Sequence, residues 1–203
     1  MGRVSRRQAL ANRATVVEAS SRLFRERGID GVSVPELMGT AGLTHGGFYR
    51  QFDSKDALAA LACTAAFDGL FDDLLPHEAS PGDLAAFLAT YLSPTHRDSP
   101  ADGCPATAFA ADVTRAPAGS PVRAAYAEGV RRFVEAVEGL TAAEGDEADA
   151  TAARQRALVT LATLVGTLTL ARATAGEPIA DELLSATRAA LGADGPAADA
   201  AAR

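Results

Sequence analysis

The chain has 203 residues with no tryptophan and few aromatic residues, and almost no stretch alternates apolar with polar residues. This length supports one or two domains with a real core, and the missing alternation argues against a β-sheet protein and for an all-α fold. The net charge of −7 divides unevenly: residues 1–55 hold nine basic and five acidic residues, and the remainder holds ten and twenty-one. A basic N-terminal module on an acidic body indicates that one end faces nucleic acid.

The apolar segments predict neither a secretory leader nor a membrane span. The N-terminus has no apolar run, and the longest apolar stretch, residues 157–171, is interrupted by threonines and a glycine and bounded by arginines. That stretch is too short and too polar to cross a bilayer. We therefore expect a cytoplasmic protein with no membrane partner, in which Cys63 and Cys104 stay reduced.

The first predicted element is a helix over residues 6–27, with apolar residues recurring on one face. Three arginines precede or open it: Arg3, Arg6 and Arg7. They form either an arm that touches phosphate or the minor groove, or a solvated terminus. The pattern alone leaves both readings open.

A helix, a glycine turn and a second helix follow. Ser33 is a good N-cap, and Glu36 completes a capping-box pattern in which each side chain satisfies the other's backbone N–H. Gly42 ends this helix, Thr44 caps the next, and residues 45–51 provide about two turns. This supersecondary unit places its second helix in a DNA major groove.

The run AGLTHGGFYRQFDSKDAL, with its surroundings over roughly residues 10–60, resembles the TetR family of transcriptional regulators. The similarity lies in the small-Gly-aliphatic-Thr turn, a glycine-containing recognition helix with Tyr49, and the later Ser-Lys-Asp-Ala-Leu. Met38 and Gly47 depart from the usual pattern. Two adjacent glycines cost about 1 kcal/mol each relative to alanine in a helix, so we expect a soft recognition helix that becomes ordered on DNA.

The DNA-contacting residues are expected to come from the helix starts and the recognition helix. Backbone N–H groups after Thr44 and at Lys55 suit phosphate, while polar side chains and close backbone approach at the two glycines suit base edges. The resemblance implies a phosphate contact for Tyr49. The full predicted set is Ser33, Thr44, His45, Gly46, Gly47, Tyr49, Arg50, Gln51 and Lys55.

Helical periodicity and turn signals continue to the end of the chain. Helices are predicted over residues 55–75, 83–92, 104–115, 120–140, 150–174 and 178–191, with a polar loop over 93–103. Counting the first three, this makes about nine helices. We expect a DNA-binding domain at 1–55, a ligand-binding and dimerisation domain at 56–191, and a disordered tail at 192–203.

A small, largely apolar effector is expected to bind between the helix at 55–75 and those after it, because the aromatic residues gather there. Taken singly, each of these residues is better explained as plain core, but as a group they are the richest supply of aromatic residues in the chain. The candidates are Phe67, Phe71, Phe87, Tyr91, Phe109, Val113, Tyr126, Val130 and Phe133.

Dimerisation is expected because one such module contacts too few phosphates and bases for useful specificity. The last two helices offer a leucine-rich surface with small residues, suited to a four-helix arrangement or to the middle of the domain. The predicted interface residues are Leu158, Leu161, Ala162, Val165, Gly166, Leu168 and Thr169.

Cys104 follows a loop and precedes a helix, a position where a thiol can become reactive. It is either a redox or electrophile sensor, as in some relatives with a comparable Gly-Cys, or a small buried hydrophobe. His96, Asp98, Asp102 and Cys104 do not have the spacing of a known metal site, so no metal is expected. No catalytic constellation is evident, so neither an enzyme nor a cofactor is expected.

The sequence therefore predicts a homodimeric, TetR-like repressor that binds a palindromic DNA operator and is released by a small effector of unknown identity. Two alternatives are a small-molecule-binding protein of the same fold that has lost operator binding, and a sensor acting through Cys104.

Overall fold

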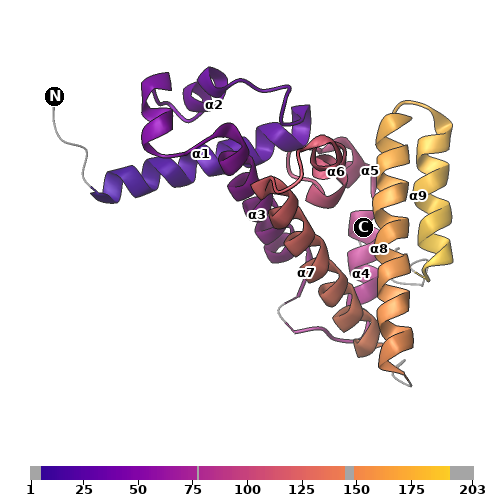
Figure 1. Cartoon of the computed structure of the whole chain (residues 1–203). Coiled ribbons are helices and arrows are strands. Elements are labelled where there is room, and N and C mark those ends of the chain that lie inside the picture. Colours follow the sequence, from indigo (N-terminus) through magenta and orange to yellow (C-terminus); the bar gives the residue numbers. More distant parts are fainter. Residues whose placement is uncertain (1–5, 77, 145–148, 193–203) are drawn as a thin grey trace. The chain divides into compact units, whose positions relative to one another are not determined.

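A computed structural model describes residues 6–76, 78–144 and 149–192 of the chain (Figure 1). Over these residues the protein has nine α-helices, one 3-10 helix and no β-strand, which confirms the all-α prediction. Most of the acidic loop between 144 and 149, and all of the predicted tail except Gly192, lie outside the described residues.

Contacts between residues divide the chain into two compact units. The N-terminal unit comprises Met1–Gly69 and Pro100–Gly129, and the C-terminal unit comprises Leu70–Ser99 and Val130–Arg203. The N-terminal unit thus holds more of the chain than the DNA-binding segment predicted at 1–55.

The N-terminal unit is built from α1 (Arg6–Arg27), α2 (Val34–Thr40), the 3-10 helix η1 (His45–Arg50), α6 (Pro105–Arg115) and the first parts of α3 (Lys55–Leu74) and α7 (Pro121–Ala143) (Figure 1). Helix α2 packs on both α1 and η1. Their side chains that face inward are almost fully buried and form the core of the helix-turn-helix: Val16, Phe24, Leu37, Met38, Phe48 and Phe52.

Within this unit, α7 passes very close to α3. A Cβ added at Gly129 would lie 2.1 Å from a ring carbon of Phe67, so only glycine fits there. The Tyr126 ring lies 6.0 Å from that of Phe67, and its hydroxyl donates a 2.7 Å hydrogen bond to the Ala106 carbonyl of α6. Burial, followed by the nearby Cys104 and Cys63 thiols, raises the pKa of Tyr126 to about 12.

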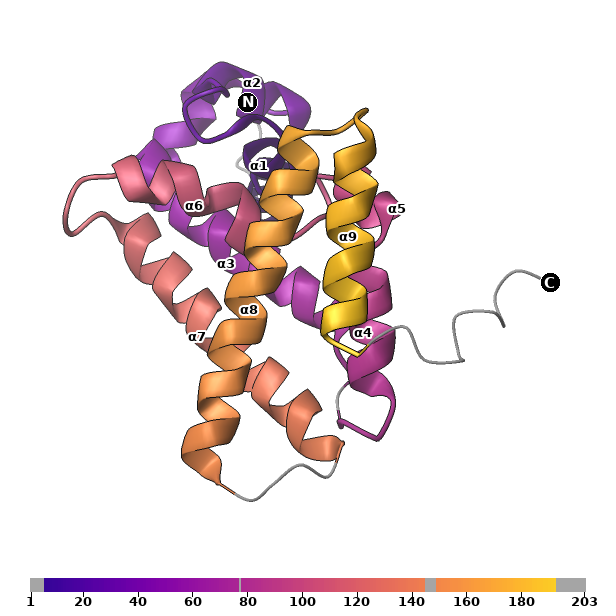
Figure 2. The ribbon, with the colours of Figure 1, turned by 90° about the vertical axis from the view of Figure 1, so that its right-hand side faces the viewer.

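The C-terminal unit contains α4 (Asp83–Tyr91), α5 (Pro94–Asp98), α8 (Ala150–Ala173), α9 (Pro178–Ala190) and the ends of α3 and α7. Helices α8 and α9 lie side by side (Figure 2). Phe133 is the centre of an aromatic cluster, with Phe71, Phe87 and Tyr91 at ring-centroid distances of 5.9, 6.1 and 6.2 Å. These rings fill the interior of the unit.

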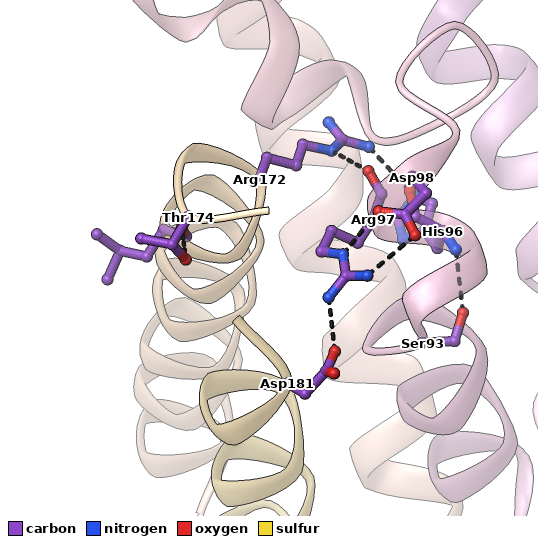
Figure 3. Close-up of polar contacts among 8 residues, drawn as sticks. Ser93, His96, Arg97, Asp98, Arg172, Thr174 and Asp181 are labelled. Carbon is purple, nitrogen blue, oxygen red and sulfur yellow. Dashed lines mark hydrogen bonds and ion pairs between the residues drawn. The ribbon is translucent and has the colours of Figure 1, made fainter. Parts of the chain in front are cut away.

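The predicted loop at 93–103 was wrong in part, because it contains the short helix α5. Ser93 caps it by accepting a hydrogen bond from the His96 N–H at 3.1 Å, and Pro94 suits the first turn. At its other end, Arg172 of α8 donates to the carbonyls of His96 and Arg97, at 3.1 Å each (Figure 3). A helix this short is stabilised mainly by such tertiary contacts.

A salt bridge also connects α5 to α9. The Arg97 guanidinium donates to Asp98 at 2.7 Å and to Asp181 at 2.6 Å (Figure 3). Hydrogen bonds to both carboxylates raise the pKa of Arg97, and the bond from Arg97 lowers the pKa of Asp98. The pair Asp98 and Asp181 thus fixes Arg97 between two helices of the same unit.

Helix α8 spans 24 residues, in agreement with the helix predicted over 150–174, and is long and apolar enough by composition to cross a membrane. A core helix of a globular unit has the same property. Here α8 packs along α9, and its inward residues, which include Ala157, Leu161, Leu164 and Leu168, are buried within the protomer.

Candidate nucleic-acid interface

Helix α2 begins at a serine cap. The Ser33 hydroxyl accepts a hydrogen bond from the Glu36 N–H at 3.4 Å, which is half of the predicted capping box. The other half was wrong, because the Glu36 carboxylate binds Arg27 instead. That hydrogen bond is the main cause of the lowered pKa of Glu36, and it ties the start of α2 to the end of α1.

The turn after α2 is a Schellman motif. Gly42, with a φ of +70°, donates to the Gly39 carbonyl at 2.9 Å, and Leu43 donates to the Met38 carbonyl at 2.8 Å. The left-handed conformation at Gly42 requires glycine. This closed turn sets the direction in which the recognition helix leaves.

The recognition helix η1 has six residues and forms a 3-10 helix rather than an α-helix. At three residues per turn this still gives about two turns, as predicted. Thr44 stands at the N-cap position, but its side chain makes no capping hydrogen bond, contrary to the prediction. Its carbonyl accepts from the Gly47 N–H at 3.0 Å.

The outward residues of η1 are those expected to meet DNA. Tyr49 is 70% exposed, and Arg50 is also exposed. Phe48, which precedes Tyr49, is fully buried. The Phe48 ring supports Tyr49 edge-on, at 5.1 Å and 88°. Gly46 is exposed and Gly47 is half-buried near Met38.

Gln51 is placed differently from Tyr49 and Arg50. It is half-buried, and its Oε1 atom is buried, so the side chain does not stand out from the helix as a base contact requires. Its backbone carbonyl accepts a 3.2 Å hydrogen bond from Arg13 of α1, whose guanidinium lies 4.6 Å from the centre of the Phe52 ring. No sequence pattern indicated this role for Arg13, which lies 38 residues away from Gln51.

Lys55 begins α3, and Ser54 is its N-cap, because the Ser54 hydroxyl accepts from the Ala57 N–H at 3.0 Å. Lys55 is half-buried and lines a cavity of about 290 Å³ with Asp56 and Asp112. A cation at a helix start, beside free backbone N–H groups, suits a phosphate.

Helix α6 is fastened to α1. The Asp112 carboxylate accepts a 2.7 Å hydrogen bond from the Ile29 N–H just after α1, and Arg25 donates to the Gly103 carbonyl at 3.0 Å. Arg22 and Asp102 form an ion pair. These partners lie 78 to 83 positions apart in the chain, so no local sequence pattern indicated that α6 and the residues before it contact α1.

The predicted ligand-binding residues are divided between the two units. Phe67, Phe109, Val113 and Tyr126 belong to the N-terminal unit, and the other five belong to the C-terminal unit. Six of the nine are buried, and Phe71, Tyr126 and Val130 are half-buried. Of the nine, Phe71 lines a cavity of about 500 Å³ between the end of α3 and α7, together with Asp72, Arg132 and Glu135. No sequence pattern indicated a role for these three charged residues.

Cys104 stands at the N-cap position of α6 and is fully buried, as is Cys63 of α3. Burial raises the pKa of the Cys63 thiol to about 12. Neither Cys63 nor Cys104 is part of a disulfide. The exposure that a directly reacting sensor needs is thus missing at Cys104, and the sensor role remains a prediction.

The predicted dimer residues fall on both sides of α8. Leu158 is 48% exposed, whereas Leu161 and Leu168 were placed wrongly, because both are buried inside the protomer. The outward apolar residues that the sequence analysis missed are Val159, Leu170 and, on α9, Ile179. The smaller members of the predicted set are at least partly accessible: Ala162, Val165, Gly166 and Thr169.

The comparisons with known proteins agree with this geometry. Residues 16–62 match the family model described as bacterial regulatory proteins, tetR family. These residues include most of α1, all of α2 and η1, and the start of α3. This segment is a TetR-family helix-turn-helix, which confirms the resemblance, and the chain has the fold of a TetR-family transcriptional regulator.

Solved structures extend the likeness in fold to nearly the whole chain. A TetR regulator from Chloroflexus aurantiacus is 24% identical, with a TM-score of 0.71 and coverage of 91% of this chain and 94% of that one. A TetR-family regulator from Cytophaga hutchinsonii is 18% identical, with a TM-score of 0.72 and coverage of 94% and 97%. E. coli NemR in its reduced form is 21% identical, with a TM-score of 0.69 and coverage of 89% and 95%. No curated protein matches the sequence.

Proposed function

We propose that this protein is a homodimeric transcriptional repressor in the cytoplasm that binds a palindromic DNA operator and is released by a small molecule. The observation that carries the proposal is the presentation of Tyr49 and Arg50 on η1. Both side chains are exposed, while Phe48 and Phe52 anchor the same short segment in the core. A segment anchored in the core, with aromatic and basic residues facing outward, suits insertion into a major groove.

The predicted contacts have different roles. Tyr49, Arg50, Lys55 and the N–H groups after Thr44 bind phosphate, and the exposed backbone at Gly46 lets η1 approach the base edges. Ser33 starts α2 and positions the turn. His45 remains a candidate base contact. Gln51 contributes to DNA binding by fixing the end of η1 through its backbone contact with Arg13, and its side chain does not read a base.

Dimerisation would use the outward face of α8 and α9. Val159, Leu170 and Ile179 are 66%, 53% and 46% exposed, a concentration of apolar surface that a second copy would cover. Two recognition helices one DNA turn apart would then read successive major grooves. An effector that prefers a state in which this spacing is lost would shift the population away from DNA.

The first test is fluorescence anisotropy with the DNA that flanks the protein's own gene, over a salt series. The wild type should bind a palindromic site specifically, with an affinity that falls steeply as salt rises. Tyr49→Ala should weaken binding by about tenfold or more, the equivalent of losing a phosphate contact and its stacking support. Tyr49→Phe should show how much of this loss belongs to the hydroxyl.

The control is Leu61→Ala, which alters a 37% exposed residue of α3 outside the predicted DNA-contacting set and should bind like the wild type. Equal binding by Tyr49→Ala and the wild type would contradict the proposed interface. A folded dimer with no specific binding at low salt would support the alternative in which the protein binds small molecules without binding an operator.

A further inference from the structure

We propose that the groove between α3 and α7, defined by Phe71, Asp72, Leu75, Arg132, Glu135 and Leu140, binds a small organic cation with an apolar body. We further propose that this groove is the effector site, and this second statement rests on the function proposed above. All six residues belong to the C-terminal unit. The groove therefore exists within one compact unit.

The size of the groove suits a small molecule. Its volume is about 500 Å³, within the range of about 300–1,000 Å³ that is usual for small-ligand sites. The aromatic cluster around Phe133, which the sequence favoured as the pocket, is instead filled by its own rings at 5.9–6.2 Å. Phe71 belongs both to this aromatic cluster and to the lining of the groove.

The charge of the groove selects a cation. Its lining has two carboxylates, Asp72 and Glu135, and one basic residue, Arg132. Among the described residues, neither carboxylate takes part in an ion pair or side-chain hydrogen bond. A ligand cation would meet a net charge of −1 there, whereas an anion would be repelled.

The groove already holds a cation on its aromatic wall. The Arg132 guanidinium carbon lies 4.7 Å from the centre of the Phe71 ring, inside the distance of about 6 Å for a cation–π contact. Arg132 is half-buried and anchored on α7. A ligand cation can occupy the same face of Phe71 if the arginine side chain moves toward solvent. Leu75 and buried Leu140 offer apolar contact to the rest of the ligand.

Isothermal titration calorimetry with tetraphenylphosphonium tests the charge preference. Tetraphenylborate has the same shape and the opposite charge, so it should bind at least about tenfold more weakly. Asp72→Asn and Glu135→Gln should each weaken phosphonium binding by about fivefold, because each removes one partly exposed ionic contact. Asp73→Asn removes the same charge from the neighbouring position of α3, outside the groove lining, and should bind like the wild type.

A second pair of variants tests the place of the cation. Arg132→Met frees the face of Phe71 and should strengthen phosphonium binding severalfold, whereas Arg131→Met removes an equal charge next to it and should change binding little. Phe71→Leu should weaken binding by about fivefold. The proposal would be overturned if the two arginine variants had equal effects. It would also be overturned if both tetraphenyl ions bound equally well, or if phosphonium did not bind.

Operator binding is measured separately, so the site and the proposed function fail in different ways. If the groove is the effector site, phosphonium should release the wild type from operator DNA and should release Asp72→Asn and Glu135→Gln only at higher concentration. If the protein binds phosphonium but the ligand-free protein does not bind an operator, the proposed function is contradicted and the proposed cation site is not. Operator release that is unchanged in both variants would overturn the effector role of the groove.

Discussion

His96 is a half-buried histidine whose environment disfavours its charged form. Desolvation lowers its pKa below the ordinary value of 6.5, and the nearby Arg172 adds to this, while a 2.7 Å hydrogen bond between Nδ1 and the Tyr91 carbonyl opposes it. The Tyr91 ring lies 4.7 Å from the imidazole. His96 is therefore explained as a neutral, half-buried histidine that donates to the Tyr91 carbonyl at the end of α4.

The lowered pKa predicts a pH-dependent stability. Because the unfolded chain takes up a proton at about pH 6.5 while folded His96 does not, the free energy of unfolding should fall as the pH drops below about 6.5. The slope for one proton is at most about 1.4 kcal/mol per pH unit. Urea unfolding between about pH 7.5 and pH 5 measures it.

The variant His96→Asn keeps an N–H donor near the Tyr91 carbonyl but cannot titrate. It should be less stable at all pH values, because it loses the ring contact, yet its stability should vary less between about pH 6.5 and pH 5. A slope that is the same in His96→Asn and the wild type would count against this explanation.

At the scale of single elements, the recognition helix and its turn use glycine for two different reasons. Gly42 has a φ of +70°, which side chains rarely adopt, whereas Gly46 has a negative φ and open space where the Cβ of an alanine would lie. The first glycine is required by geometry. The second leaves η1 weak, because glycine has a low helix propensity and the element is a short 3-10 helix.

Alanine substitutions four residues apart should therefore have opposite effects. Gly42→Ala should destabilise the protein by about 1–2 kcal/mol, the cost of a left-handed residue with a Cβ. Gly46→Ala should stabilise it by about 0.5–1 kcal/mol. Thermal unfolding, with about 2–4 °C per kcal/mol for a chain of this size, resolves both changes.

A decrease in stability for Gly46→Ala would mean that η1 needs glycine for more than backbone approach to DNA. Operator binding by this variant adds a second measurement. If the absence of a side chain at Gly46 allows close approach to the groove floor, Gly46→Ala should weaken operator binding while it raises the melting temperature.

At the scale of the whole molecule, we expect the outward side of α8 to form the proposed dimer interface. Val159→Arg places a charge on a residue that is 66% exposed in the protomer, so the fold should be retained. If α8 forms the dimer interface, the charge would be buried against the second copy and should weaken dimerisation by about tenfold or more. Sedimentation analysis over a concentration series measures this change.

Leu61→Arg is the matched control, because it makes the same kind of change at an exposed leucine of α3. It should leave the dimer intact. Operator affinity should fall in Val159→Arg and not in Leu61→Arg, since only a dimer spans two half-sites. A Val159→Arg protein that remains a dimer would place the interface elsewhere.

The sequence by itself determined the helical class, the bounds of most helices and the helix-turn-helix. These features depend on signals within a few residues, such as the cap at Ser33, the glycine stop at Gly42 and the 3.6-residue apolar period of α1 and α3. The match of residues 16–62 to the TetR family depends on the same local pattern.

Only the tertiary structure decided which side of α8 faces inward, where Gln51 points, and that a short helix replaces part of the loop at 93–103. Leu158 and Leu161 are equivalent as leucines, and only packing leaves the first at 48% exposure and buries the second at 5%. Arg172 stabilises α5 from more than seventy residues away. Burial and long-range hydrogen bonds depend on what surrounds a residue in space, and a local sequence pattern does not contain that information.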